Sequence, residues 1–256
     1  MQIDYYAYRS GMKEWNAGLK VFLAVGTLCM LLMAGCLPVS VMVWAAMGML
    51  TLFVGKVPFK VYLRYLLVPL GFLFAGCLVI TIQLSGSAYG EWNLSLHFFY
   101  LCVTKNSLAA AIRVFFQVLA GISTLYMLSF STPVSEMILV LEKLHLPKIL
   151  LELMHLIYRY IFILFEVTGQ MQAAARARLG YQGFWKSCRT FSMTCGNLFL
   201  ISMKKANSYY DAMLARGYQG RLEFLTEEKP VGSLHIAGCL LYFAGILLLI
   251  AYCKLG

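Results

Sequence analysis

The stretch GSLHIAGCLLYFAGILLLIAYC at residues 232–253 contains no Asp, Glu, Lys or Arg. An α-helix needs about 20 apolar residues to cross the roughly 30 Å hydrocarbon core of a bilayer. Because the stretch is long enough and uncharged, it predicts a transmembrane helix. Apolar stretches with few charges also occupy residues 19–36, 38–55, 61–84 and 108–130. The sequence therefore predicts about five transmembrane helices.

The composition of the whole chain points to the same environment. Of its 256 residues, 61% are hydrophobic and 12% are charged, and the mean hydropathy is +0.76. A soluble domain usually carries about 25% charged residues, and a chain of this length cannot bury so much apolar surface in one water-facing fold. Lipid gives backbone groups no hydrogen-bond partner, so the spans must be helices or a closed barrel. The apolar runs are longer than barrel strands, which favours an all-α, polytopic membrane protein.

The distribution of positive charge predicts the orientation. The formal net charge is +10, but no nucleic-acid-binding motif accompanies the basic residues, so we expect no nucleic-acid partner. Lys and Arg instead mark the cytoplasmic segments of membrane proteins. The N-terminal segment contains Arg9, Lys13 and Lys20, and the connection between the second and third stretches contains Lys56, Lys60 and Arg64. The loop 85–107 contains only Lys105. In a cell inner or plasma membrane, five spans then place the N-terminus in the cytoplasm and Gly256 outside.

Cysteine and histidine do not form a metal-binding pattern. There are eight cysteines and four histidines, and no C-x-x-C occurs. The pairs Cys29/Cys36 and Cys188/Cys195 are each spaced by two helical turns. The histidines are scattered, at His97, His145, His155 and His235. We therefore expect no metal ligand set and no cofactor, and we interpret the cysteines as small apolar packing residues.

Residues 131–230 differ from the rest of the chain, because they hold more than half of its 21 Lys and Arg residues. Thr132-Pro133 with Glu136 predicts a helix start, and Pro147 ends that short helix and begins another. Charged residues then follow at helical intervals on one face, at Lys148, Glu152, Arg159 and Glu166. The next helix, roughly 184–216, has an apolar core of only six residues (198–203), which is too short to cross a bilayer.

Both of these helices are therefore expected to be long and amphipathic, and to lie at or below the cytoplasmic surface. This interpretation divides the chain into three parts. An N-terminal membrane domain with four transmembrane helices covers 1–130. A cytoplasmic module of amphipathic helices covers 131–230, and a final transmembrane helix covers 231–256.

Two similar motifs end the amphipathic helices: ARLGYQG at 177–183 and ARGYQG at 215–220. Each has a small residue, an arginine, and then a glycine (Gly180 or Gly217) that can adopt the left-handed conformation that ends a helix. Capping alone explains one arginine and one glycine, but it needs no repeated Tyr-Gln-Gly. Two similar cationic tips predict two similar pockets, as a twofold-related dimer provides. An arginine fork suits this task because it can hold a carboxylate with two hydrogen bonds.

At these motifs the chain resembles the transmembrane T component of energy-coupling factor (ECF) transporters, of the CbiQ type found in cobalt and nickel importers. The resemblance also covers Ile3-Asp4, Ala7-Tyr8, Ser10, Trp15-Asn16 and Lys20, and the segment from Thr132-Pro133 through Leu144-His145-Leu146-Pro147 to Tyr158-Arg159-Tyr160. Ala215-Arg216-Gly217 is its most specific part. The first motif departs from the pattern with a leucine after Arg178, and Arg176 in Ala175-Arg176-Ala177 offers a competing register. Analogy with the second motif favours Arg178.

The resemblance implies a non-catalytic coupling subunit of an ABC-type importer. Two cytoplasmic ATPases (CbiO-like) would drive the paired helices, and a separate substrate-binding membrane subunit (CbiM-like, with or without a CbiN-like accessory) would respond. The residues that the resemblance places at the ATPases are Ala177, Arg178, Leu179, Ala215, Arg216 and Gly217. Cobalt is the expected substrate, and nickel or a vitamin are alternatives. No G-x-x-x-x-G-K-[ST] occurs in the chain, so partners must supply the nucleotide chemistry.

Two functions of other classes are alternatives. A self-contained secondary permease needs ionisable residues in mid-span, but the predicted spans contain almost no charge apart from Arg113. A membrane-embedded hydrolase needs an acid–base pair or metal ligands. Its nearest candidates, His155 and Glu152, lie one helical turn apart, where a surface ion pair explains them more simply. Co-purification with a pair of ATPases would separate these functions from the coupling role.

Overall fold

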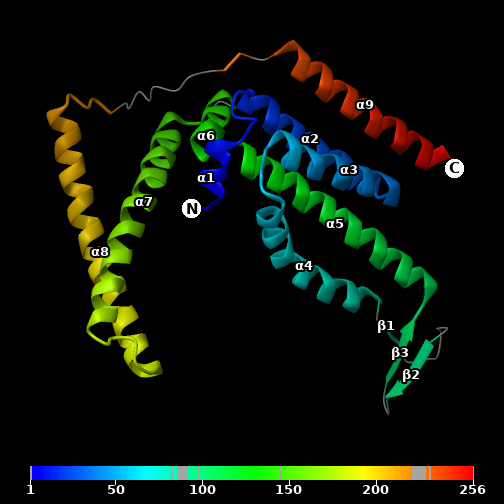
Figure 1. Cartoon of the computed structure of the whole chain (residues 1–256), viewed down its shortest axis with the longest axis horizontal. Helices are drawn as coiled ribbons and strands as arrows, with labels where there is room; N and C mark the ends of the chain where they lie inside the picture. The colour runs from blue at the N-terminus through cyan, green and yellow to red at the C-terminus, as the bar shows by residue number, and fades with distance from the viewer. Residues whose placement is uncertain are drawn as a thin grey trace. The chain divides into compact units, whose positions relative to one another are not determined.

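The computed structural model describes residues 2–81, 83–85, 92–96, 99–144, 146–220, 229–230 and 232–255 (Figure 1). His97, His145 and Gly256 lie outside these residues, so the expectations that concern them stay predictions. The chain divides into two compact units. The first, Met1–Met137 with Glu227–Gly256, is called the membrane unit below, and the second, Ile138–Thr226, is called the hairpin unit.

Five helices in the described part of the chain are long and apolar enough to cross a membrane. They are α2 (Ala17–Ala34), α3 (Leu37–Met49) with its π-helical continuation η1 (Leu50–Val54), α4 (Phe59–Thr81), α5 (Lys105–Ser131) and α9 (Ser233–Leu255). Their bounds agree with the five predicted stretches to within about three residues, an offset that is normal at helix ends. The prediction of an all-α, polytopic membrane protein is confirmed.

Local sequence accounts for the tight connection between α2 and α3. The side chain of Asn16 caps the start of α2, where its Oδ1 accepts a 2.8 Å hydrogen bond from the Gly18 N–H. The helix ends at Gly35, whose φ of 57° lies in the left-handed region that glycine adopts without strain. Pro38 then stands in the first turn of α3, where a missing N–H leaves no hydrogen bond unmade.

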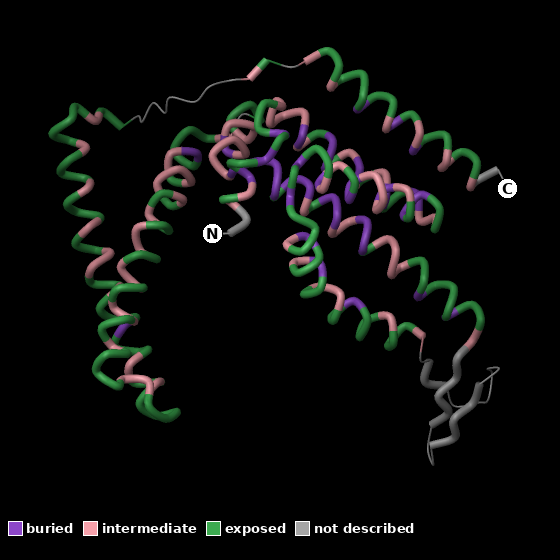
Figure 2. Tube along the Cα trace, in the orientation of Figure 1, coloured by how far each residue is buried: buried purple, intermediate pink, exposed green. Residues whose placement is uncertain are grey.

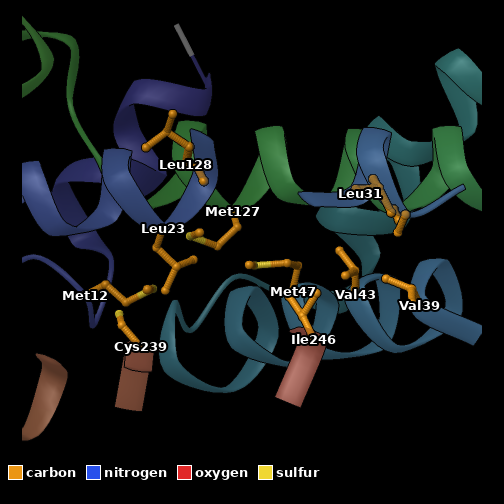
Figure 3. Close-up of a cluster of buried hydrophobic side chains, with 13 residues drawn as sticks. Met12, Leu23, Leu31, Val39, Val43, Met47, Met127, Leu128, Cys239 and Ile246 are labelled. Carbon is orange, nitrogen blue, oxygen red and sulfur yellow. The ribbon is translucent and has the colours of Figure 1, made fainter. Parts of the chain in front are cut away.

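Helix α5 packs against α2, α3, α4 and the short N-terminal helix α1 (Gln2–Arg9). Figure 2 shows buried positions along much of its length. The Tyr62 hydroxyl of α4 donates a 3.0 Å hydrogen bond to Ser123 of α5. A cluster of buried apolar side chains joins α2, α3, α5 and α9 (Figure 3). In this cluster Ile246 of α9 lies beside Met47 of α3, and both are fully buried.

The sequence predicts a loop over 85–107, and this prediction is wrong in part. The structure has three strands here: β1 (Gln83–Ser85), β2 (Trp92–Leu96) and β3 (Phe99–Val103). They form an antiparallel sheet in the order β1-β3-β2. The WNLSL sequence of β2 alternates apolar and polar residues, which is the period of a strand. A search for runs long enough to span a membrane overlooks such short segments.

The remaining helices begin and end close to the positions that the sequence predicts. Helix α6 (Val134–Lys143) begins after Pro133 and crosses from the membrane unit into the hairpin unit. Helices α7 (Lys148–Ala177) and α8 (Phe184–Ala215) form an antiparallel pair. Their bounds agree with the predicted helix after Pro147 and with the predicted helix over 184–216. Figure 2 shows that most of their residues are exposed.

The burial of Ile246 predicts what its truncation costs. Ile246→Ala removes side-chain atoms from the cluster between α9 and α3, and the loss is one of packing, because lipid is as apolar as isoleucine. We expect the free energy of unfolding to fall by about 1–3 kcal/mol, measured by thermal denaturation in detergent. Leu248→Ala is the matched control, since Leu248 lies on the same helix but is 72% exposed. Equal effects of the two substitutions would contradict the docking of α9 on this cluster.

Candidate functional site

The two Ala-Arg motifs lie at opposite ends of the helical hairpin. The first tip, Arg178–Gly183, connects α7 to α8, and the second tip, Arg216–Gly220, follows α8. Because α7 and α8 run in opposite directions from the first tip, the second tip lies toward the end at which α7 starts, and Figure 1 shows the two helices diverging there. Helix α8 has 32 residues, so the tips are separated by about 48 Å of helix.

Two backbone hydrogen bonds close α7 at the first tip. The Leu179 N–H donates to the Arg176 carbonyl at 3.0 Å, and the Gly180 N–H donates to the Ala175 carbonyl at 2.9 Å. This pair of bonds is a Schellman motif, which satisfies carbonyls that the helix end leaves without intrahelical partners.

The second tip closes α8 with the same two bonds. The Gly217 N–H donates to the Leu214 carbonyl at 3.0 Å, and the Tyr218 N–H donates to the Met213 carbonyl at 3.0 Å. Backbone geometry therefore makes Leu179 the counterpart of Gly217, and Arg176 the counterpart of Leu214.

Backbone torsions place Arg178 and Arg216 at equivalent positions. Each is the residue that ends its helix, with φ −93° and ψ 16° for Arg178 and φ −92° and ψ 10° for Arg216. The following residue is left-handed in both tips, with φ 56° at Leu179 and 82° at Gly217. Of the two candidate registers in the first motif, the one with Arg178 has the geometry of the second motif.

The left-handed residue of the first tip is a correction to the sequence analysis, which predicts Gly180 in that role. Gly180 instead serves a close approach between the end of α7 and the start of α8. Thr190 Oγ1 donates a 2.7 Å hydrogen bond to the Gly180 carbonyl. A Cβ on Gly180 would lie 2.9 Å from that Oγ1 and 3.0 Å from the Ala175 carbonyl oxygen. The close approach therefore favours glycine at 180, while the cap geometry places the left-handed conformation at Leu179.

The side chains of both tips are available to a partner. The predicted tip residues are all exposed: Ala177, Arg178, Leu179, Ala215, Arg216, Gly217 and the alternative Arg176. Within the described ranges, no ion pair involves Arg178 or Arg216. A guanidinium without an internal carboxylate partner can bind one on another protein.

The second tip has a side-chain contact with the first turns of α7. The Tyr218 hydroxyl lies 3.5 Å from the Glu152 carboxylate of α7. Desolvation and then the nearby Glu152 charge raise the pKa of Tyr218, so the phenol stays neutral and can donate. His155, the other half of the hydrolase alternative, has its Nδ1 at 3.2 Å from the Leu151 carbonyl.

The hairpin offers little to a metal ion. Among the residues that the structure describes, no group of three or more His, Cys, Asp or Glu side chains could hold one. A cavity of about 250 Å³ lies between α7 and α8. Its lining is mostly apolar and aromatic: Tyr160, Ile163, Leu164, Ser202, Met203, Lys205, Ala206 and Tyr209. Such a lining favours an apolar occupant over an ion.

A buried ionic cluster in the membrane unit escapes the sequence analysis. By sequence, Lys20 indicates orientation and Glu136 indicates a helix start. In the structure, Lys20 Nζ donates to the Ser131 carbonyl at 2.9 Å and lies 3.6 Å from a Glu136 oxygen, while Lys229 pairs with the other oxygen. The sequence contains one sign of this cluster, namely Lys20, because a charged residue inside a predicted span implies a buried partner.

The different residues at the left-handed position lead to opposite mutational effects. A left-handed conformation costs a non-glycine residue about 1–2 kcal/mol, although glycine also raises the entropy of the unfolded chain. Gly217→Leu should therefore lower the free energy of unfolding by about 1 kcal/mol, and Leu179→Gly should leave it unchanged or raise it. Thermal denaturation of the purified variants measures both. A clear loss of stability in Leu179→Gly would contradict the assigned cap geometry.

Comparison with known proteins matches this chain to the family described as cobalt transport protein, CbiQ, over residues 9–227. The chain is 30% identical over 230 residues to an uncharacterised protein of Methanocaldococcus jannaschii, covering 89% of this chain and 85% of that protein. It is 25% identical over 239 residues to the cobalt transport protein CbiQ of Rhodobacter capsulatus, covering 93% of both chains.

A further relative is longer than this chain. A protein of Methanocorpusculum labreanum, named as a fused cobalt transport protein CbiMQ, is 28% identical over 243 residues, which are 94% of this chain and 40% of that protein. The family match includes both tips and the buried ionic residues Lys20 and Glu136. Together with the five membrane-spanning helices, this match over most of the length means that the chain belongs to the CbiQ family of cobalt transport proteins.

Proposed function

We propose that this chain couples two cytoplasmic ATPases to a substrate-binding membrane subunit in a cobalt importer of the ECF type. The observation that carries the proposal is the pair of exposed arginines, Arg178 and Arg216, on helix ends of the same backbone geometry. The chain lacks a G-x-x-x-x-G-K-[ST] motif, so ATP is bound by the partners. The family match supports a role in cobalt transport.

The chemistry of the tips suits docking into acidic grooves. Arg178 and Arg216 each offer a planar fork that can hold a carboxylate with two hydrogen bonds. The preceding alanines, Ala177 and Ala215, add little bulk, so each helix end can enter a narrow groove. A rigid helix about 48 Å long joins the two sites, so movement of one ATPase relative to the other must move the hairpin.

The partners follow from the same proposal. The two tips call for two similar ATPase subunits (CbiO-like), arranged about a twofold axis. The name of the fused relative joins CbiM and CbiQ in one chain, which supports a CbiM-like substrate-binding partner, with or without a CbiN-like accessory. We assign cobalt as the substrate on the strength of the family. Nickel would need the same coupling subunit with a different substrate-binding partner.

The proposal requires the tips to face the cytoplasm. Lys and Arg are abundant in residues 131–230 and beside the first spans, which supports a cytoplasmic N-terminus and hairpin. Five spans in the described chain then leave the C-terminus outside.

This topology can be tested by labelling in intact cells. After replacement of the native cysteines, Lys186→Cys in the hairpin should react with a membrane-impermeant maleimide only after permeabilisation. A cysteine added after Gly256 should react without permeabilisation, because the reagent reaches the outer surface directly. Strong labelling at position 186 in intact cells, or none at the C-terminus, would contradict the arrangement.

Charge reversal at the tips tests the coupling role. Arg178→Glu or Arg216→Glu places a carboxylate against an acidic groove, so attraction becomes repulsion in a partly desolvated pocket. Losing one member of such a pair typically weakens binding by about 30-fold or more. We expect normal membrane yield, reduced co-purification of the ATPases and reduced Co²⁺ uptake, with the double variant worse than either single one. Opposite charge reversal in the ATPase groove should restore part of the binding.

Arg176→Glu is the matched control, because residue 176 lies about 200° around the helix from residue 178. Arg176 is exposed, as Arg178 is, and the substitution changes the charge by the same amount. The Arg176→Glu variant should retain the ATPases. Loss of assembly in Arg176→Glu but not in Arg178→Glu would mean that Arg176 makes the first contact. Full assembly and uptake in both Arg178→Glu and Arg216→Glu would refute the coupling role.

A further inference from the structure

The buried ammonium of Lys20 joins two helices at one corner of the membrane unit. Lys20 is only 1% exposed, and a buried charge is costly unless it is paired. Its Nζ donates to the carbonyl of Ser131, the last residue of α5, at 2.9 Å. It also lies 3.6 Å from Glu136 Oε2, in the first turn of α6. One cation therefore contacts both sides of the Thr132-Pro133 corner.

Helix dipoles favour this arrangement. The carboxyl end of α5 carries partial negative charge and attracts the ammonium of Lys20, while the amino end of α6 carries partial positive charge and attracts the carboxylate of Glu136. The Tyr8 hydroxyl of α1, 3.4 Å from Ser135 Oγ, adds a second contact on the same turn of α6. The start of α6 is thus held to the membrane unit by polar contacts on neighbouring residues.

The other oxygen of Glu136 holds the chain segment that precedes α9. Glu136 Oε1 pairs with Lys229 Nζ, which also donates to the Lys13 carbonyl at 2.6 Å. The Lys229 carbonyl in turn accepts a 2.7 Å hydrogen bond from Asn16 Nδ2. Two ammonium groups share one carboxylate, and each also donates to one backbone carbonyl, Lys20 to Ser131 and Lys229 to Lys13.

The cluster stands where the chain enters and leaves the hairpin unit. That unit covers Ile138–Thr226, so Glu136 precedes the first crossing and Lys229 follows the second by a few residues. The Glu136–Lys229 pair therefore ties together the two chain segments through which the hairpin unit is covalently attached.

We propose that Lys20, Glu136 and Lys229 form a positioning clasp that fixes both attachments of the hairpin unit to the membrane unit, so that motion of the tips moves the spans. The inference rests on the proposed coupling function. Motion transmitted through a hairpin needs attachments that resist the force, because slack connections would absorb the displacement. Helices in lipid associate through van der Waals packing without a hydrophobic driving force, and paired charges with defined partners add contacts that specify one position.

The decisive variant removes both ionic ties and leaves one charge, Lys229, which is 23% exposed and keeps its hydrogen bond to the Lys13 carbonyl. Glu136→Gln alone strands the buried ammonium of Lys20, which destabilises a fold, but replacing both members of a buried pair is often neutral. Lys20→Met with Glu136→Gln therefore keeps the volume while it deletes the ionic ties. Glu142→Gln, an exposed carboxylate on the same helix α6, is the matched control.

The variants are measured in the complete transporter, reconstituted in liposomes with both ATPases and the substrate-binding subunit. The double variant should retain the ATPases and hydrolyse ATP within about twofold of the unmodified complex, while Co²⁺ uptake falls about tenfold or more, because hydrolysis no longer moves the spans. The Glu142→Gln control should transport normally. Lys229→Gln removes the ion pair between Lys229 and Glu136. Because the Lys229 side chain is 23% exposed, this variant should lose part of the uptake with assembly intact.

Two outcomes overturn the clasp. One is uptake by the double variant and Lys229→Gln within about twofold of the unmodified complex. The other is a loss of uptake that only matches the loss of assembled complex, since the cluster would then do no more than stabilise the fold. If the double variant does not assemble, Lys229→Gln decides alone by the same comparison. Failure of the unmodified chain to retain the ATPases would instead refute the coupling function itself.

Discussion

Lipid offers no hydrogen-bond partner to a peptide group, and this constraint determines most of the membrane unit. Every backbone N–H and C=O of a span must be satisfied inside the span, so α2 to α5 and α9 are helices. The same rule governs buried hydroxyls. Thr27, Thr51 and Thr124 donate to the carbonyls four residues earlier in their own helices, at 2.6, 2.7 and 2.9 Å. A threonine bonded in this way behaves as a small residue that lets neighbouring helices approach.

The constraint also decides where charge can enter. Helix ends are the places at which a membrane protein has free carbonyls and N–H groups, and the ammonium of Lys20 is buried at such a place, between the end of α5 and the start of α6. Helix ends are also where a chain leaves its spans. Ionic contacts and the connections to the hairpin unit therefore coincide for a physical reason.

The positions of the spans could be predicted because hydropathy is a local property of about 20 residues. The bounds of α7 and α8 were also accessible, through Pro147 and the two Gly-containing motifs. Contacts between distant residues were not. Lys20 and Ser131 are 111 residues apart in sequence, and Glu136 and Lys229 are 93 apart, so no local pattern pairs them. The left-handed conformation of Leu179 was missed for a similar reason, because Thr190, on the next helix, keeps Gly180 for a close contact.

The two tips have the same backbone geometry, but the conformational free energy that it costs differs between them. Gly217 adopts the left-handed conformation freely, whereas Leu179 adopts it against a penalty of about 1–2 kcal/mol. The same hydrogen bonds form in both, and both arginines are the capping residue that directly follows the last helical residue. What the tips share is therefore the direction in which a rigid helix presents an arginine, rather than the residue that ends the helix. In the proposed coupling role, a groove that binds the arginine would also constrain the helix axis, so that a displacement between two ATPases would rotate the hairpin.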